Sequence, residues 1–338
     1  MFTLLLAGSG PLSVGWIAAQ EPATTAAGPL TTGTAQNTAG AAASQAQALL
    51  ERAGRSIETH RSISARIFQH ADLFGHQLMG SGRYREVCQG AIPLIRLELK
   101  IQIAEQAASL VQVCDGRHLW TYRKLLDAET LSYIDAVRVT EALGRIERGR
   151  VEAGKGDRYL LCEAPGGPFR QKVPVPFSWP AVGLGGVSRM LRGLRDAFEF
   201  TSAQQGRVGD LAVWKIVGGW RPYHLARLLP KQKDKIEQGG SVDLGYLPEH
   251  LPDRVVLYLG QEDLFPRRID YYRVAAPKKS RFEVKDDRTL MTVEFIDVAF
   301  DIPIADGQFV YNPGTAERSD RTEELLQSLT AGRPVPPK

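Results

Sequence analysis

The sequence predicts an α+β fold built around a long antiparallel β-sheet. The clearest observation is the run Leu94–Ile103, in which apolar residues alternate strictly with charged or polar ones. Period two is typical of a strand, and a polar face on one side indicates an antiparallel sheet. Further strand-like runs follow one another with short turns, which disfavours βαβ units. At about 3.3 Å per residue this strand spans roughly 33 Å, which suits a curved sheet around the protein's own core or around an apolar ligand.

Composition and charge narrow the class of protein. The chain has 338 residues, of which 43% are hydrophobic and 24% are charged, enough for a sizeable buried core. The net charge of +4 comes from 42 basic and 38 acidic residues, and no dense Lys/Arg block occurs. This balance argues against nucleic acid as a partner.

The first residues are typical of an export signal. Residues 2–20 carry no charge and end in Ala18-Ala19-Gln20, which resembles a signal-peptide cleavage site. An uncleaved anchor is the alternative, although several glycines and a proline interrupt the apolar run. We therefore expect a periplasmic or otherwise exported protein of the cell envelope. The expected organisation is a signal peptide at 1–20, a disordered Ala/Thr/Gly linker at 21–45, one domain at 46–320 with an irregular insertion at 221–252, and a disordered tail at 321–338.

The elements of the domain follow from periodicity and turn residues. Leu49, Leu50, Ala53 and Ile57 recur at helical spacing and predict a first helix at 46–60. Alternating runs then predict strands at 63–74, 77–88, 92–104, 109–114, 118–123 and 131–139, and Asp115-Gly116 predicts a hairpin turn. A helix is expected at 140–148. After a Pro/Gly-rich stretch at 163–186, strands are expected at 199–207, 211–218, 254–259, 267–274 and 290–300.

The clearest amphipathic helix is predicted at 187–198. Its apolar stripe follows the i, i+3, i+4, i+7 rule and consists of Val187, Met190, Leu191, Leu194 and Phe198. Arg189, Arg192 and Arg195 lie on the flank. One interpretation is a lid over an apolar mouth, with the arginines at the rim near lipid phosphates or an anionic membrane surface. The other is a static core helix with a solvated flank.

Motifs for catalysis or metal binding are missing from the sequence. There is no HExxH, GxSxG, Walker loop or zinc-type cysteine spacing, and no cofactor is expected. His70 and His76 form a weak metal pair without a third ligand. Cys88, Cys114 and Cys162 are interpreted as buried small residues, with a Cys88–Cys114 disulfide as the alternative. Catalytic carboxylates need only spatial proximity, so a hydrolase with dispersed catalytic residues stays an alternative.

Apolar stripes are the remaining functional signal. The candidate cavity residues are Ile95, Leu97, Leu99 and Ile101 on one strand and Val111, Val113, Trp120 and Tyr122 on the two strands that follow. Each of them alone is compatible with ordinary core packing. The pattern as a whole favours a cavity for an apolar ligand.

Three segments resemble one known family. Residues 110–122 resemble its "L-V-x-D-G-x-x-L-W-x-Y" stretch, residues 63–69 followed by Gly82-Arg83-Tyr84 resemble its first two strands, and residues 309–314 resemble its terminal "F-x-F-x-P-P-x-G". The family is the lipoprotein-localisation carrier superfamily (LolA/LolB-like). The resemblance implies an open antiparallel β half-barrel with helices covering the concave face, which holds acyl chains.

The resemblance also implies a function and partners. It implies an exported, non-catalytic binding protein that holds acyl chains of a lipid or lipoprotein, with membrane-protein partners for loading and release and transient contact with a membrane surface. One feature departs from the family: no arginine precedes the proline in Gln89-Gly90-Ala91-Ile92-Pro93, where the carrier has an arginine that ties down its lid. The alternative function is a structural or interaction module of the envelope with a filled core.

Overall fold

A computed structural model of the chain describes residues 32–73, 76–88, 90, 92–103, 106–125, 128–152, 179–274 and 288–330. The predicted signal peptide, most of the Pro/Gly-rich stretch and Cys162 lie outside the described residues. None of the described helices is long and apolar enough to cross a membrane.

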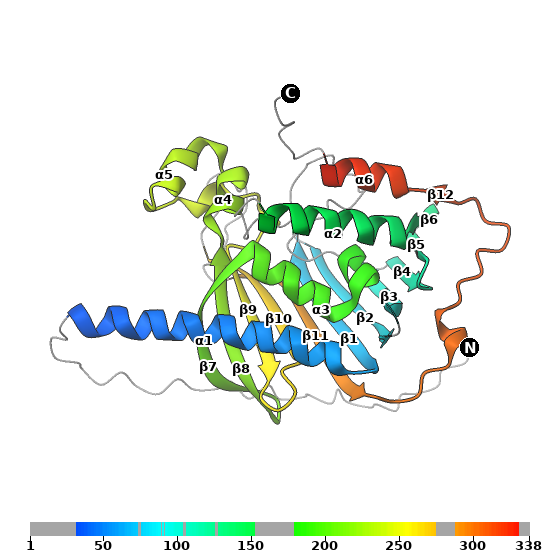
Figure 1. Ribbon diagram of the computed structural model, residues 1–338, viewed down its shortest axis with the longest axis horizontal. Coiled ribbons are helices and arrows are strands. Elements are labelled where there is room, and N and C mark those ends of the chain that lie inside the picture. Colours follow the sequence, from blue (N-terminus) through cyan, green and yellow to red (C-terminus); the bar gives the residue numbers. More distant parts are fainter. Residues whose placement is uncertain are drawn as a thin grey trace, which may run out of the picture.

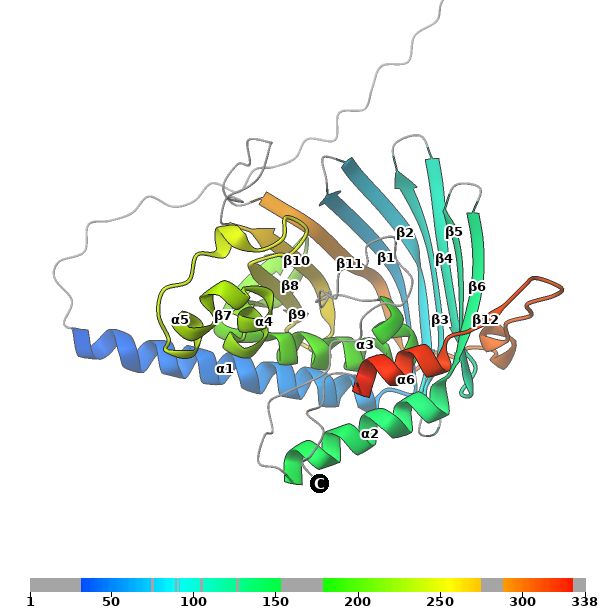
Figure 2. The same cartoon turned by 90° about the horizontal axis from the view of Figure 1, so that it is seen from above.

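One curved, open sheet forms the body of the molecule (Figure 1, Figure 2). Its 12 strands lie in the order β12-β6-β5-β4-β3-β2-β1-β11-β10-β9-β8-β7. All neighbours are antiparallel except β12 and β6, which are parallel. The strands are β1 (Ser62–Leu73), β2 (His76–Val87), β3 (Leu94–Ile103), β4 (Gln106–Cys114), β5 (His118–Leu125), β6 (Ala128–Asp135), β7 (Phe198–Val208), β8 (Leu211–Trp220), β9 (Arg254–Gly260), β10 (Pro266–Arg273), β11 (Arg288–Phe300) and β12 (Ser319–Asp320). The predicted α+β half-barrel is confirmed.

The main helices gather at one end of the sheet, and the strands β1 to β6 extend beyond them (Figure 2). These helices are α1 (Thr32–Thr59), α2 (Ala136–Glu152), α3 (Trp179–Ala197) and α6 (Thr322–Thr330). α1 packs on β7 and α3, and α3 packs on β3, β4 and β7. We call the sheet face that α3 contacts the inner face and the opposite face the outer face.

Beneath the helices the inner face is a closed apolar core. Ile63 of β1, Ile95 of β3 and Leu119 of β5 are almost fully buried there. Leu50 of α1 and Leu194 of α3 belong to the same core. Burial of such side chains, about 1.5–3 kcal/mol each, is the main force holding the helices on the sheet.

Several element boundaries differ from the sequence predictions. The strand predicted at 131–139 ends at Asp135, because the Asp135 carboxylate accepts the Arg138 N–H (2.9 Å) and so caps α2 at its start. Phe198 is the first residue of β7 and not the last of a helix. The helix predicted to begin at residue 46 begins at Thr32, inside the predicted linker, where alanine is abundant and favours helix.

The predicted disordered tail is wrong for residues 322–330. These residues form α6, in which Leu325 and Leu329 are buried. The Asp320 carboxylate accepts the Thr322 N–H (2.8 Å), and the Thr322 hydroxyl accepts the Asp135 N–H (2.9 Å). These buried leucines and hydrogen bonds therefore hold the end of the described chain against β6 and α2.

The insertion at 221–252 is compact and not irregular. It contains α4 (Pro222–Leu228), η1 (Pro230–Gln232), α5 (Lys233–Glu237) and η2 (Leu244–Tyr246). The buried guanidinium of Arg273 in β10 donates to the carbonyls of Leu244, Leu247 and Leu251 (3.2, 3.0 and 3.1 Å). One buried cation thus satisfies three carbonyls and fixes the insertion to the sheet.

Candidate ligand-binding site

Burial of the inner face falls with distance from the helices. Along β3, Ile95, Leu97 and Leu99 are 0%, 0% and 1% exposed, whereas Ile101 is partly exposed. Leu110 of β4 is also partly exposed, and Leu125 of β5 is 48% exposed. The main helices lie over one end of the sheet (Figure 2), and Ile95 is buried whereas Ile101 and Leu125 are not. Among the described residues, the other end therefore carries apolar side chains without a helix above them.

We call this second region the open inner face. Strand pairing places all of its side chains on the same side of the sheet as Leu99. It consists of Leu78, Ile101, Leu110, Leu125 and Met291. Uncovered apolar area marks ligand-binding grooves or interaction surfaces, so the open inner face is the candidate ligand-binding surface.

The eight predicted cavity residues do not share a face. The register pairs Leu97 with Gln112 and Glu98 with Val111, so Val111 and Val113 point to the outer face. Trp120 and Tyr122 pair with them and lie on the outer face as well. The prediction of one cavity is corrected accordingly, because pairing of whole strands, and not apolar character, decides which residues share a face.

The outer-face group is covered in part by the C-terminal segment. After β11 this segment runs around the outside of β3 to β6 before β12 pairs with β6 (Figure 1). Tyr311 stacks on Trp120 with ring centres 5.7 Å apart, and Arg96 donates to the Gln308 carbonyl (3.0 Å). Val113 is fully buried on this face. These aromatic residues fasten the segment and do not face the open inner face.

The predicted lid helix is α3, and it is bent in the middle. Gly185 and Gly186 are non-helical, and Gly186 has φ +68°, a region that favours glycine. Beyond this kink, Val187, Met190, Leu191 and Leu194 are between 0% and 5% exposed. The stripe therefore packs into the core in the structure, and the lid interpretation stays a prediction.

A buried hydrogen-bond chain holds the kink. The Val187 N–H donates to the Tyr84 hydroxyl (3.2 Å), and this hydroxyl donates to the Glu86 carboxylate. A Cβ at Gly186 would lie 2.2 Å from Glu86 Oε1, so only glycine allows this approach. The Cys88 thiol also faces Glu86 Oε1, at 3.7 Å. The carboxylate is thus surrounded by donors and enclosed by the backbone of α3.

The pKa values around this chain reflect burial. Burial raises the pKa of Glu86 from its usual value and raises that of Tyr84 well above 10. Burial, with the nearby Glu86 carboxylate, raises the pKa of Cys88 to about 12. A thiol with such a pKa is a weak nucleophile. Cys88 and Cys114 are both free thiols, so the alternative of a disulfide between them is not realised.

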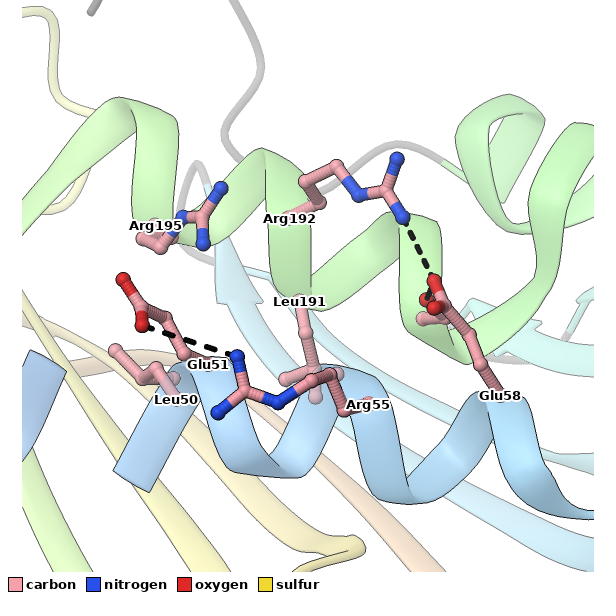
Figure 3. A pocket seen from close by; sticks show the side chains of 9 residues that line it. Leu50, Glu51, Arg55, Glu58, Leu191, Arg192 and Arg195 are labelled. Carbon is pink, nitrogen blue, oxygen red and sulfur yellow. Dashed lines mark hydrogen bonds and ion pairs between the residues drawn. The ribbon is translucent and has the colours of Figure 1, made fainter. Parts of the chain in front are cut away.

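The three predicted rim arginines lie away from the open inner face. Arg192 and Arg195 line a groove of about 260 Å³ between α1 and α3 (Figure 3). Arg192 pairs with Glu58 (2.7 Å), and Arg55 of α1 approaches Glu51 at 4.0 Å. Arg189 lines a neighbouring pocket of about 340 Å³ beside Glu86. These arginines lie on the side of α3 that faces α1 and solvent. The prediction that they stand at the rim of an apolar mouth is therefore wrong.

Sequence reasoning missed the polar residues of the inner face. Tyr84 and Glu86 share a face with Leu97 and Ile95 through the register of β2 and β3. Gln112 lies beside Leu97 and is fully buried. The period-two alternation of a strand, counted from residue 84 to residue 86, could have placed Tyr84 and Glu86 on one face from the sequence. In the described ranges no group of His, Cys, Asp or Glu side chains is arranged to hold a metal ion.

Comparisons with known proteins found similar solved structures at low sequence identity. No family model matches the chain, and no curated protein sequence matches it. Among solved structures, LprF from Mycobacterium bovis is 9% identical (78% of this chain, 96% of that chain, TM-score 0.34). LppX, a lipoprotein from Mycobacterium tuberculosis, is 11% identical (77% and 98%, TM-score 0.32).

A third similar structure is an outer-membrane lipoprotein-sorting protein domain from Vibrio parahaemolyticus. It is 10% identical to this chain, with 78% and 97% of the two chains covered and a TM-score of 0.30. Identities and TM-scores this low leave the function to be inferred from the geometry of the described residues. These three solved structures are what the chain is similar to.

Proposed function

We propose that the protein is an exported, non-catalytic carrier or sensor that holds acyl chains of a lipid or lipoprotein against the open inner face. The observation that carries this proposal is the change in burial along the inner face, from the closed core at Ile95 to the uncovered apolar side chains at Ile101 and Leu125. A surface of this kind fits an extended apolar ligand.

The energetics of burial fit reversible acyl binding. Each CH₂ group removed from water contributes about 0.8 kcal/mol. Burial of a single long acyl chain therefore contributes more free energy than association costs. Several chains would bind too tightly for release unless part of the site opens. Loading and release through membrane-protein partners and transient contact with a membrane surface belong to the same proposal.

Mass spectrometry of lipid extracted from the purified protein tests the proposal directly. We expect wild-type protein to retain acyl lipid and the Leu110→Glu and Leu125→Glu variants to lose it while remaining folded. Met79→Glu is the matched control, because Met79 is 64% exposed on the outer face. A folded Leu125→Glu protein that retains as much lipid as wild type would contradict the proposal.

The same experiment addresses the alternative functions. An envelope interaction module with a filled core would carry no lipid in any variant. The closed core beneath α3, where Leu97 is fully buried, is the feature that this alternative shares with the carrier proposal. Wild-type protein without lipid would therefore favour the interaction module.

A further inference from the structure

Gln112 is a buried polar residue in the apolar inner face. Its side chain is 0% exposed, and its Nε2 donates to the Thr121 hydroxyl at 3.4 Å. Its Oε1 has no hydrogen-bond partner among the described residues. Buried carbonyl groups are almost always paired in native proteins, so an unpaired one at this position calls for a physical explanation.

The backbone of α3 covers this oxygen without pairing with it. A Cβ at Gly183 would lie 3.0 Å from Gln112 Oε1 and 3.0 Å from Leu119 Cδ1. Gly183 belongs to the first part of α3, residues 179–184, which the kink at Gly185 and Gly186 separates from the rest of the helix. Val182 and Leu184, which flank Gly183, are 0% and 4% exposed in the core, so a ligand that displaces residues 179–184 must replace the apolar contacts of these two side chains.

Gln112 also lies at the inner end of the open inner face. On β4 it is two residues from Leu110 on the same side of the strand, about 7 Å away along the chain. On β3 it is paired with Leu97, which is 0% exposed in the closed core. A ligand that lies along Leu125 and Leu110 therefore points one end toward Gln112.

We propose that Gln112 and Thr121 form a polar subsite that selects ligands with a hydrogen-bond donor next to the acyl chain, an amide N–H or a hydroxyl. This inference rests on the proposed acyl-binding function. Residues 179–184 turn away at Gly185 and Gly186, Gln112 Oε1 accepts the donor, and the Thr121 hydroxyl remains bonded to the amide group of Gln112. An apolar site with a few placed polar groups is the common design of a selective ligand site.

Two probes of almost equal shape test the subsite. N-methylhexadecanamide carries one N–H where methyl hexadecanoate carries an ester oxygen. The full chain is titrated with each probe, and the ratio of the two Kd values is compared between wild type and Gln112→Met. In the variant we expect the Kd ratio, which measures the preference for the amide over the ester, to fall by about 5-fold.

A matched variant locates the effect. Gln69 of β1 is a second inner-face glutamine whose Oε1 lacks a described partner, and its Nε2 faces the sulfur of Met291 (3.3 Å). We expect Gln69→Met to keep the wild-type ratio. Loss of the preference in Gln69→Met but not in Gln112→Met would overturn the assignment to Gln112.

Further outcomes separate the two proposals. Unchanged ratios in both variants, with both probes bound, would overturn the subsite and leave the acyl-binding function intact. Failure of wild type to bind either probe would overturn the acyl-binding function itself. Thr121→Val serves as a second variant of the subsite, and we expect it also to lower the relative preference for the amide while thermal unfolding shows a folded protein.

Discussion

Tyr84 and Glu86 stand on the same side of β2, and the Tyr84 hydroxyl links the Glu86 carboxylate to the backbone N–H of Val187. Val187 opens the second part of α3, where backbone N–H groups have no partner inside the helix. The hydroxyl has one proton, which it gives to Glu86, and it uses a lone pair for the Val187 N–H. The Tyr84 side chain of the sheet thus caps the second part of α3.

Tyr84→Phe should loosen this connection. The change removes the acceptor of the Val187 N–H and one donor to the buried carboxylate, so we expect a loss of about 1–3 kcal/mol in the free energy of unfolding. Amide hydrogen exchange should quicken at Val187 more than at Ile95 in the core. Tyr246→Phe is the control, since Tyr246 is 57% exposed. Equal quickening at Val187 and Ile95 would indicate general destabilisation and not a local cap.

Glu86 should make stability depend on pH. Its pKa in the folded protein is raised by burial above the ordinary 4.5. A raised pKa means that the folded state holds the proton more tightly, so this contribution to stability is present below pH 4.5 and is lost as the pH rises through the folded pKa. Denaturant unfolding of wild type and Glu86→Gln over a pH series measures it.

In that series the stability of wild type relative to Glu86→Gln should decline with rising pH. Glutamine keeps the acceptor for the Tyr84 hydroxyl and does not titrate, so the pair isolates ionisation of Glu86. The neighbouring titratable groups Tyr84, Cys88 and Glu58 are present in both proteins. A difference that is constant across the series would show that Glu86 does not change its protonation on folding.

Leu97 and Leu110 should respond differently to the same substitution. Leu97 is 0% exposed beneath the helices, so Leu97→Glu buries a charge and should prevent folding, and Leu97→Ala should cost about 2–5 kcal/mol. Leu110 is partly exposed on the open inner face, so Leu110→Glu should fold. Circular dichroism and denaturant unfolding compare them. A folded Leu97→Glu protein would place the ligand surface deeper than we propose.

The arginines of α3 test contact with a membrane surface. Replacing Arg189, Arg192 and Arg195 by glutamine should weaken sedimentation with anionic vesicles, and more strongly at low salt, because surface charge attraction is screened by ions. The effect should be modest, since Arg192 is already paired with Glu58. Arg207→Gln, at the β7–β8 turn, is the control. Unchanged vesicle binding in the triple variant would show that these arginines have a structural role and do not contribute to membrane contact.

The sequence by itself determined the existence of most strands and the antiparallel class. Alternation in Leu94–Ile103 needs no partner to be recognised, because one wet and one dry face are properties of a single strand. The amphipathic stripe at Val187, Leu191 and Leu194 was also visible, since i, i+4 and i+7 lie on one side of any helix. Periodicity of this kind depends only on residues that are close together in the sequence.

Only the tertiary structure decided which apolar residues face one another. Register places Gln112, and not Val111, beside Leu97, and a shift by one residue would have exchanged the two faces of β4. The helices cover one end of the sheet, which makes Leu97 core and leaves Leu125 uncovered. These relations join residues far apart in the chain, and periodicity within one segment contains no information about them.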